Sequence, residues 1–364
     1  MPMQQRRNLM LAAVWAAALP GSVWAADGGA SRRQAVVQAL GDGDAHAPLT
    51  HAVLVEQHHE LLAEAYFTAD DQPAGDWFAR RVAFDAGTLH DMRSISKSVV
   101  ALLVGIAWAQ GRIDMQRPVM DWFPEHAALA APPRNAIRLP HLLSMTAGLD
   151  WDESTASYAS PTNSETRMGL TLDPAGYVLS RDIVAAPGTR FEYSGGATLL
   201  LAEIVERATG KPVDDYAREA LFTPLGIADF AWRHHVLWAK PLPYSGLRLT
   251  PRSMIALGRL VLDGGRRGSQ AIVPDAWLAP LQQPQVAHTG RGLGYGWQWW
   301  VGRIEQGPAA STGWFAGLGN GGQVLMVVPA LDAVLAVTAG HYNSPAGIQV
   351  SLAICRRVID ALVG

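Results

Sequence analysis

The order of strand-like and helical patterns along the chain constrains its fold more than any other feature of the sequence. Residues 52–57 and 61–67 are apolar, partly alternating runs separated by a short polar break, which predicts a β-hairpin. Four further strands are expected, one of them in the first third of the chain and three near its other end: residues 88–92, 296–300, 323–328 and 333–338. The middle of the chain shows helical patterns between loops rich in proline and glycine.

This order predicts one α/β domain built from the two ends of the chain, residues 26–110 and 245–364. An all-α domain, residues 111–244, is expected to be inserted into it. Residues 96–109 carry apolar side chains around the whole helix rather than in one stripe, so this helix should be buried on nearly every side. Other helices are expected at residues 197–209, 250–262 and 347–362.

Composition and charge narrow the classes of partner. The chain has 364 residues, 49% of them apolar and 17% charged, which is enough for a large core. Its net charge of −3 provides no basic field for phosphates, so nucleic acid is not an expected partner. Cys355 is the only cysteine, which rules out an internal disulfide, and its apolar helical neighbours predict a core position.

The first residues have the pattern of an export signal. Arg6 and Arg7 precede an apolar run at residues 9–19, and small residues precede Ala26. Residues 1–25 are therefore predicted to be a signal peptide and the protein to be exported, periplasmic or secreted. A transmembrane anchor is the alternative, but the run is shorter than the ~20 residues that a bilayer requires. No other contact with a membrane is expected.

Ser94 and Lys97 are the first candidate catalytic residues, because they stand three residues apart at the start of the buried helix. The helix dipole favours a negative charge on a hydroxyl at that end, and burial favours the neutral amine of a lysine. Together they would form a nucleophile beside its base. The alternative is that Ser94 caps the helix and Lys97 lies in solvent. Only two other lysines occur in the chain, Lys211 and Lys240, so a lysine beside a buried helix is unusual here.

Tyr193 is the third candidate. A phenol beside an ammonium is stabilised as phenolate and could carry the proton from Ser94 to the leaving group. Alone, Tyr193 would be interpreted as a half-buried tyrosine at a turn before a helix. Its value as a candidate comes from its combination with Ser94 and Lys97.

Four motifs, in this order, resemble the serine β-lactamase family of the class C type, which also holds D-alanyl peptidases, esterases and 6-aminohexanoate-dimer hydrolases. They are the segments at residues 94–97, 142–149, 187–194 and 221–227, within a similarity that spans residues 52–338. The resemblance implies a β-lactamase/transpeptidase-like α+β fold, with an antiparallel sheet flanked by helices, an inserted helical domain and the site in the cleft between them. It also implies that Ser94 is the nucleophile, Lys97 its base partner and Tyr193 the tyrosine of the second motif.

Two departures from the family pattern affect the expected substrate. Gly195 stands where the second motif normally has an asparagine, and the third motif with its lysine or histidine is missing from its usual place. His288 begins a His-Thr-Gly run, but this run comes too early in the chain to be that motif. Counting back from the strand at residues 323–328 places the third motif near Trp314 and Gly317.

Four residues are therefore expected to bind substrate. The backbone N–H near Gly317 would join that of Ser94 as an oxyanion hole. Asn320 would line the rim, and Trp314 and Tyr158 would belong to an apolar acyl pocket, together with other aromatic residues at 299, 300 and 315. Without a cationic third motif, the carboxylates of β-lactams and peptidoglycan stems should bind poorly.

The resulting prediction is a serine hydrolase that cleaves esters or amides of small molecules. A D-alanyl carboxypeptidase or weak β-lactamase is the alternative, and a catalytically inactive ligand-binding relative is the alternative from a different class. No Gly-x-Ser-x-Gly elbow and no His-Glu-x-x-His pair occurs in the sequence. No cofactor and no metal is expected, and the sequence predicts no oligomeric state.

Overall fold

The computed structural model describes residues 28–40, 49–305, 311–344 and 346–363. The expected signal peptide, residues 1–25, lies outside these described residues. Within the described part of the chain, no helix has the length and apolar character needed to cross a membrane.

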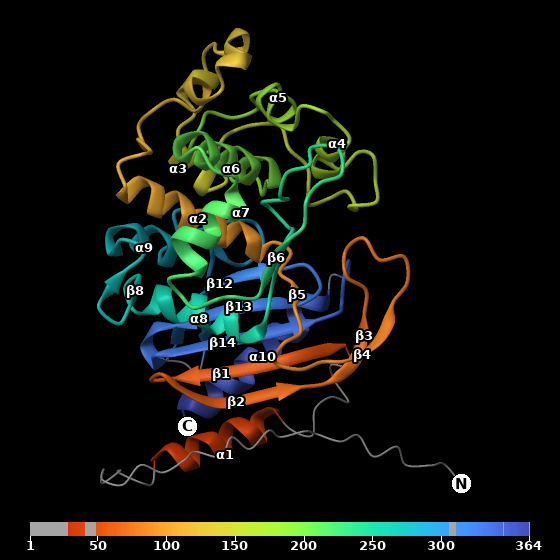
Figure 1. Ribbon diagram of the computed structural model, residues 1–364, viewed down its shortest axis with the longest axis vertical. Helices are drawn as coiled ribbons and strands as arrows, with labels where there is room; N and C mark the ends of the chain where they lie inside the picture. Colours follow the sequence, from red (N-terminus) through yellow and green to blue (C-terminus); the bar gives the residue numbers. More distant parts are fainter. Residues whose placement is uncertain (1–27, 41–48, 306–310, 345, 364) are drawn as a thin grey trace.

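The centre of the fold is a seven-stranded antiparallel sheet in the order β10-β11-β12-β13-β14-β1-β2. Its strands are β1 (Thr50–Gln57), β2 (Glu60–Tyr66), β10 (Gly294–Tyr295), β11 (Trp300–Glu305), β12 (Ser311–Gly319), β13 (Gln323–Val328) and β14 (Ala333–Ala339). β1 pairs directly with β14, so strands from the two ends of the chain lie side by side, as Figure 1 shows in orange and blue. The expected hairpin of β1 and β2 and the expected antiparallel sheet are confirmed.

Helices cover both faces of this sheet. α1 (Gly28–Leu40) and α10 (Ala346–Val363) pack together against one face, whereas α2 (Ile95–Ala109), α8 (Pro251–Leu262) and α9 (Asp275–Gln282) contact strands from the other. Every residue of β1, β13 and β14 is buried as a result, which explains why β13 and β14 are almost continuous apolar runs. Cys355 lies buried in α10, as expected.

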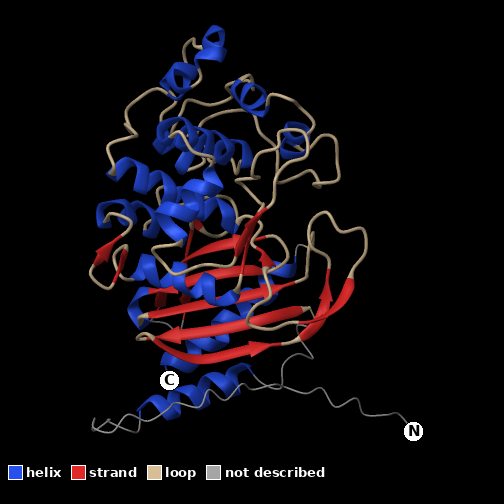
Figure 2. Ribbon diagram, in the orientation of Figure 1, coloured by secondary structure: helices blue, strands red, loops and turns tan. Residues whose placement is uncertain are grey.

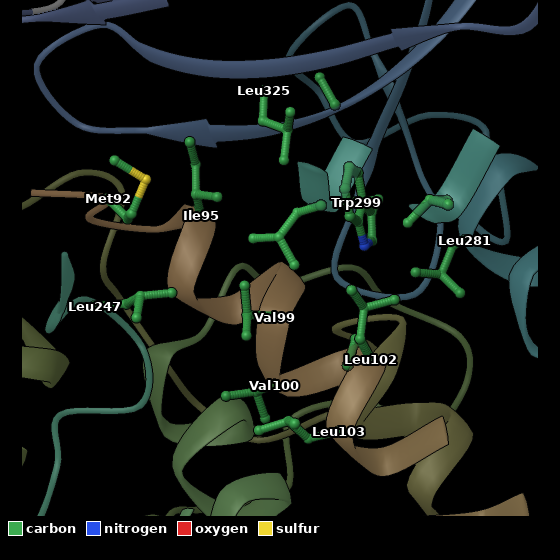
Figure 3. Packing of buried hydrophobic residues seen from close by; sticks show 14 of the residues in the cluster. Met92, Ile95, Val99, Val100, Leu102, Leu103, Leu247, Leu281, Trp299 and Leu325 are labelled. Carbon is green, nitrogen blue, oxygen red and sulfur yellow. The ribbon is translucent and has the colours of Figure 1, made fainter. Parts of the chain in front are cut away.

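α2 is the helix that carries the candidate nucleophile and base, and it lies in the middle of the core. Its first thirteen residues, 95–107, are all buried. Figure 3 shows Ile95 and Val99 with Leu325 of the main sheet on one side and with Met92 and Leu247 on the other. Burial of one such aliphatic side chain contributes about 2 kcal/mol, so the position of this helix is firmly fixed.

The remaining helices form the upper part of the molecule in Figure 2, away from the main sheet. They are α3 (Leu139–Leu143), α4 (Ser164–Gly169), α5 (Pro174–Leu179), α6 (Gly195–Thr209) and α7 (Val213–Ala217), with short 3₁₀ turns at residues 119–122, 124–129 and 134–136. α6 ends at Gly210, whose φ of 73° gives the left-handed turn expected there. α6 packs on α2, so the upper helices rest on the same helix as the sheet.

The prediction that residues 111–244 are entirely helical is wrong. β6 (Phe230–Trp232) pairs with β7 (Leu247–Leu249), and β7 pairs with β5 (His90–Asp91) in a separate three-stranded sheet. The strand expected at residues 88–92 is therefore only β5 and does not join the main sheet. Two more short pairs join β3 (Thr68–Asp71) to β4 (Arg80–Ala83) and β8 (Arg266–Arg267) to β9 (Gln270–Ala271).

The strand expected at residues 296–300 begins only at Trp300. The preceding segment is a buried loop in which Gln298 has a φ of 60° and its side chain is hydrogen-bonded to other elements. Its amide donates to the carbonyl of Leu142 at 3.0 Å and accepts from Thr198 at 2.8 Å, while its own carbonyl accepts from Ser98 at 2.7 Å. These contacts link α2 and the upper helices to the edge of the sheet.

Candidate active site

Ser94 is placed at the start of α2 by the short strand β5 and the turn that follows it. The preceding residue, Arg93, has a φ of 49°, in the left-handed region that side chains rarely adopt. Its guanidinium lies 3.3 Å from the Asp91 carboxylate and over the ring of Tyr342. The Ser94 side chain makes no capping hydrogen bond, so its hydroxyl is free for chemistry. Ser94 stands at the N-cap position of α2, but the alternative that its hydroxyl serves to cap the helix is wrong.

Lys97 is buried below Ser94 rather than exposed to solvent. Its side chain is 1% exposed, and its Nζ donates to Ser94 Oγ at 3.1 Å and to the backbone carbonyl of Tyr244 at 3.1 Å. The alternative of a solvated lysine is excluded by this burial. The ammonium of Lys97 therefore contacts the nucleophile on one side and the segment between β6 and β7 on the other.

Tyr193 lies on the other side of Ser94, at the turn before α6. It is 7% exposed and lines the same cavity as Ser94. Lys97 Nζ is 4.9 Å from the centre of the Tyr193 ring, and Trp300 stacks on that ring with the centroids 5.6 Å apart. Ser194 caps α6 by accepting from the N–H of Ala197, which fixes the direction of the turn. The structure therefore brings Ser94, Lys97 and Tyr193 together.

The charge state of Lys97 differs from the expectation of a neutral amine. Burial lowers the pKa of Lys97, but electrostatic interactions with Tyr193, Glu153 and Glu165 raise it more, and the net pKa is above its usual range. Burial raises the pKa of Tyr193 and outweighs the opposing effects of Lys97 and of the hydrogen bond with Ser94. Desolvation alone predicted the wrong direction for Lys97 because the sequence did not show the carboxylates beside it.

Those two carboxylates were not identified from the sequence. Glu153, in the loop after α3, has a fully buried side chain 3.7 Å from Lys97 Nζ. Glu165, in α4, lies 4.0 Å from the same nitrogen with its side chain 13% exposed. The only local signal was their closeness in sequence to Tyr158, since nothing in their spacing points to Lys97.

Two cavities meet at Ser94. One, of about 470 Å³, has a wall that is about equally polar and apolar and includes Arg93, Glu165 and Tyr244. The other, of about 300 Å³, is bounded by Tyr193, Trp300 and the apolar side chains Leu293, Leu318, Ile348 and Leu352. Tyr158 and Asn320 line both cavities, as expected for residues that contact substrate.

Tyr158 and Asn320 are both held in place by hydrogen bonds. The Tyr158 hydroxyl donates to Glu153 Oε1 at 3.1 Å. The Asn320 amide donates to the side chain of Asn343 at 3.0 Å and accepts from the backbone N–H of the same residue at 2.7 Å. Their positions beside Ser94 are consistent with a role in binding the acyl or leaving group.

Trp314 does not belong to this site. It is buried in β12, packs against Gly302 of β11 and lines a different cavity, bounded by Gln282 and Pro329, which does not include Ser94. Side chains alternate between the two faces of a strand, and Trp314 lies several residues before the end of β12 that reaches the nucleophile. Trp299 and Phe315 are also core residues, in edge-to-face contact.

Gly317 is displaced from the expected oxyanion position. A Cβ on Gly317 would point at Ser98 and Ile95 of α2, and Gly317 lines neither cavity at Ser94. Gly319, two residues later on the same strand, lines the apolar cavity with Ser94, and a Cβ there would lie 2.4 Å from the carbonyl oxygen of Met92. Counting back from the strand at residues 323–328 therefore led to a glycine two residues before the one that lines the cavity.

Arg291 is a further residue that the sequence reasoning missed. It lines the apolar cavity, with its guanidinium 5.4 Å from the ring of Tyr193 and 5.7 Å from that of Trp300. His288, three residues earlier, lines neither cavity at Ser94, in agreement with its exclusion as third motif. A cation is thus present beside the nucleophile although the third motif supplies none.

Comparison with known proteins gives a consistent result. Residues 37–347 match the family model described as Beta-lactamase. The chain is 29% identical over 306 residues to a 6-aminohexanoate-dimer hydrolase of Paenarthrobacter ureafaciens, covering 79% of this chain and 71% of that protein. It is 31% identical to the esterase EstB of Burkholderia gladioli, over 48% of this chain and 45% of that protein.

The solved structures that it resembles have the same architecture. A penicillin binding protein from Bacillus halodurans superposes with a TM-score of 0.64 over 84% of this chain and 96% of that one, at 17% sequence identity. At this identity the likeness concerns the fold alone. It confirms the α+β architecture of an antiparallel sheet flanked by helices.

Proposed function

Because the family model matches residues 37–347, the chain belongs to the Beta-lactamase family of serine hydrolases, and we propose that it cleaves small esters or amides through an acyl-enzyme on Ser94. The observation that carries this proposal is the hydrogen bond from the buried Lys97 to a serine hydroxyl that does not cap its own helix. A serine held in this way between a buried cation and a tyrosine is an activated nucleophile.

The reaction would proceed in two steps. Ser94 Oγ attacks the acyl carbonyl carbon while its proton moves to the coupled Lys97–Tyr193 pair, in the form of that pair that has lost one proton. Tyr193 then passes the proton to the departing oxygen or nitrogen as its bond to the acyl carbon breaks. Water attacks the acyl-enzyme by the same route in reverse, which releases the acid and restores the Ser94 hydroxyl.

The negative oxygen of the tetrahedral intermediate needs hydrogen-bond donors. We assign this role to the backbone N–H groups of Ser94 and Gly319, because Gly319 is the glycine of β12 that shares a cavity with Ser94. Loss of one such donor typically costs ~100-fold or more in rate. The close approach of Gly319 to Met92 requires glycine, since a side chain there would meet the carbonyl of Met92.

The substrate is proposed to be an ester or amide with an apolar acyl or leaving group that fits the 300 Å³ cavity. One observation favours a second candidate, a carboxylate-bearing substrate such as a D-alanyl peptide or a β-lactam. Arg291 lines the same cavity and supplies the cation that the third motif lacks. Both candidates use the same nucleophile and differ only in the group that the cavity binds.

Export of the protein is also proposed, on the pattern of residues 1–25. The mature chain would then begin near Ala26 and would act on molecules outside the cytoplasm. Its partners would be small-molecule substrates.

One experiment tests these proposals together: intact-protein mass spectrometry of the chain expressed with its full N-terminus in a bacterial host. After exposure to a fluorophosphonate, we expect a single adduct that maps to Ser94. A penicillin adduct in addition would support the carboxylate-binding candidate. The absence of an adduct with either reagent would contradict the acyl-enzyme, and a mass that retains residues 1–25 would contradict export.

Tyr193→Phe should separate amides from activated esters. The variant loses the group that protonates the departing atom, so hydrolysis of an anilide should fall about 100-fold or more, and that of a p-nitrophenyl ester about tenfold or less. An ester with a good leaving group departs without protonation, which is the reason for the difference. Values of kcat/KM for the two substrates measure it, and an equal loss on both would contradict the role of Tyr193 as proton carrier.

A further inference from the structure

Glu153 and Glu165 are two buried carboxyl groups from different elements that converge beside Lys97. Glu165 Oε2 and Glu153 Oε2 lie 2.4 and 3.2 Å from the point where a Cβ of Gly195 would be. Any side chain at position 195 would occupy the space that these oxygens fill. The family pattern has asparagine at this position. Glycine here leaves the space in which the two carboxyls meet.

Glu153 is surrounded by donors. Its carboxylate accepts from the indole N–H of Trp151 at 3.0 Å, from the Tyr158 hydroxyl at 3.1 Å and from the backbone N–H of Gly195 at 2.5 Å. Lys97 adds an ammonium at 3.7 Å. Three hydrogen bonds and a cation stabilise an anion, so Glu153 is the ionised member of the pair.

Glu165 has a different environment. Its carboxyl and that of Glu153 both lie within 4.0 Å of Lys97 Nζ, and two carboxyl groups buried side by side can hydrogen-bond only if one of them carries a proton. Burial and the charge of Glu153 both raise the pKa of Glu165 well above its usual value, against the opposing effect of Lys97. The proton is therefore assigned to Glu165, whose O–H would donate to the Glu153 carboxylate.

We propose that Glu153 and Glu165 form a carboxyl–carboxylate pair that shares one proton and acts as a positioning element for Lys97. In this state the pair has one negative charge, which balances one ammonium and holds it against Ser94 Oγ. If both carboxyls were ionised, the second charge would bind the proton of the Lys97–Tyr193 pair more tightly. The form that accepts the proton of Ser94 would then be populated only at higher pH.

Other ionisable groups also face the pair and contribute to its titration. They are Arg93 before α2, Tyr158 in the loop after α3, Tyr193 before α6, Tyr244 before β7 and Tyr295 in β10. Burial raises the pKa of each of the four tyrosines first of all, so they remain neutral donors near neutral pH. Within the described residues, Lys97 and Arg93 are the cations that act on Glu165.

The test rests on the proposed function for its kinetic part and compares two isosteric variants. Glu165→Gln replaces a protonated carboxyl by a neutral amide that can also donate to Glu153. We expect the acidic limb of the pH profile of kcat/KM to stay within about 0.3 pH unit of wild type. Glu153→Gln removes the one negative charge, so this limb should move to lower pH by about one unit or more.

The opposite pattern would overturn the proposal. A shift of one unit or more in Glu165→Gln would mean that Glu165 is ionised in the resting protein, and an unshifted limb in Glu153→Gln would mean that its charge does not act on Lys97. If Glu153→Gln does not fold, Glu165→Gln decides alone.

A second readout does not depend on any substrate. The infrared spectrum of wild type at pH 7 should contain the C=O band of a protonated carboxyl that is missing from Glu165→Gln. Absence of this band from the difference spectrum would refute the shared proton even if the proposed hydrolase activity is correct. Conversely, the band would remain if the protein proved to hydrolyse nothing, so the two proposals fail separately.

Discussion

Ser94→Ala is expected to reduce hydrolysis of a p-nitrophenyl ester by about 10⁴-fold or more, to the level that binding and the oxyanion donors alone provide. The reason is that no other hydroxyl takes its place. Ser94 Oγ is the oxygen to which Lys97 donates, and both cavities open at this residue. Removal of one oxygen therefore removes the acyl-enzyme altogether.

Ser98→Ala is the matched control, one turn further along α2. Ser98 is also buried, but its hydroxyl donates to the backbone carbonyl of Gln298 and has a structural role. This variant should lose about 1 kcal/mol of stability and less than about threefold in kcat/KM. Activity of Ser94→Ala within tenfold of wild type would show that the chemistry uses another nucleophile.

The elements that the sequence predicted well are those that local pattern determines. The apolar residues around α2 and the continuous apolar runs of β13 and β14 can be recognised without knowledge of what packs on them. The same holds for Ser94 and Lys97, whose contact follows from their spacing of three residues on one helix. Tyr193 could be identified as part of the site only through the resemblance to a family, because it comes from a distant part of the chain.

The features that were missed depend on contacts between distant segments. Glu153 and Glu165 lie in a loop and in a short helix, and only the tertiary fold brings them to Lys97. The charge of Lys97 was predicted in the wrong direction for this reason. Gly317 was chosen by counting back from the strand at residues 323–328, whereas the glycine of β12 that lines the cavity with Ser94 is at position 319.

The short strands also could not be predicted from local sequence pattern. β5, β6 and β7 have two or three residues each, too few for a periodic pattern to identify them. The pairing of β5 with β7 nevertheless positions the turn that precedes Ser94. The backbone carbonyl of Tyr244, which accepts from Lys97, lies just before β7 and shows that this small sheet contributes directly to the site.

Lys97→Met is expected to have two large effects. The rate of ester hydrolysis should fall about 10³-fold or more, since Ser94 loses both the donor that stabilises its developing negative charge and one member of the pair that accepts its proton. The protein should also lose about 3 kcal/mol or more of stability, because the carboxylate of Glu153 remains buried without its ammonium. Steady-state kinetics and chemical denaturation measure the two effects.

Lys240→Met is the control for the stability effect. Lys240 pairs with Glu206 at 2.8 Å, but its side chain is 53% exposed, so loss of this pair should change stability by less than about 1 kcal/mol. Acidification should distinguish the two variants. In Lys97→Met the buried carboxyl groups gain stability when they take up protons, so its deficit relative to wild type should decrease from pH 7 to about pH 5, whereas that of Lys240→Met should hardly change. If the stability deficit of Lys97→Met is small, or grows on acidification, the buried ion pair of Lys97 and Glu153 is contradicted. Both the mechanism and the proton-sharing pair depend on this ion pair.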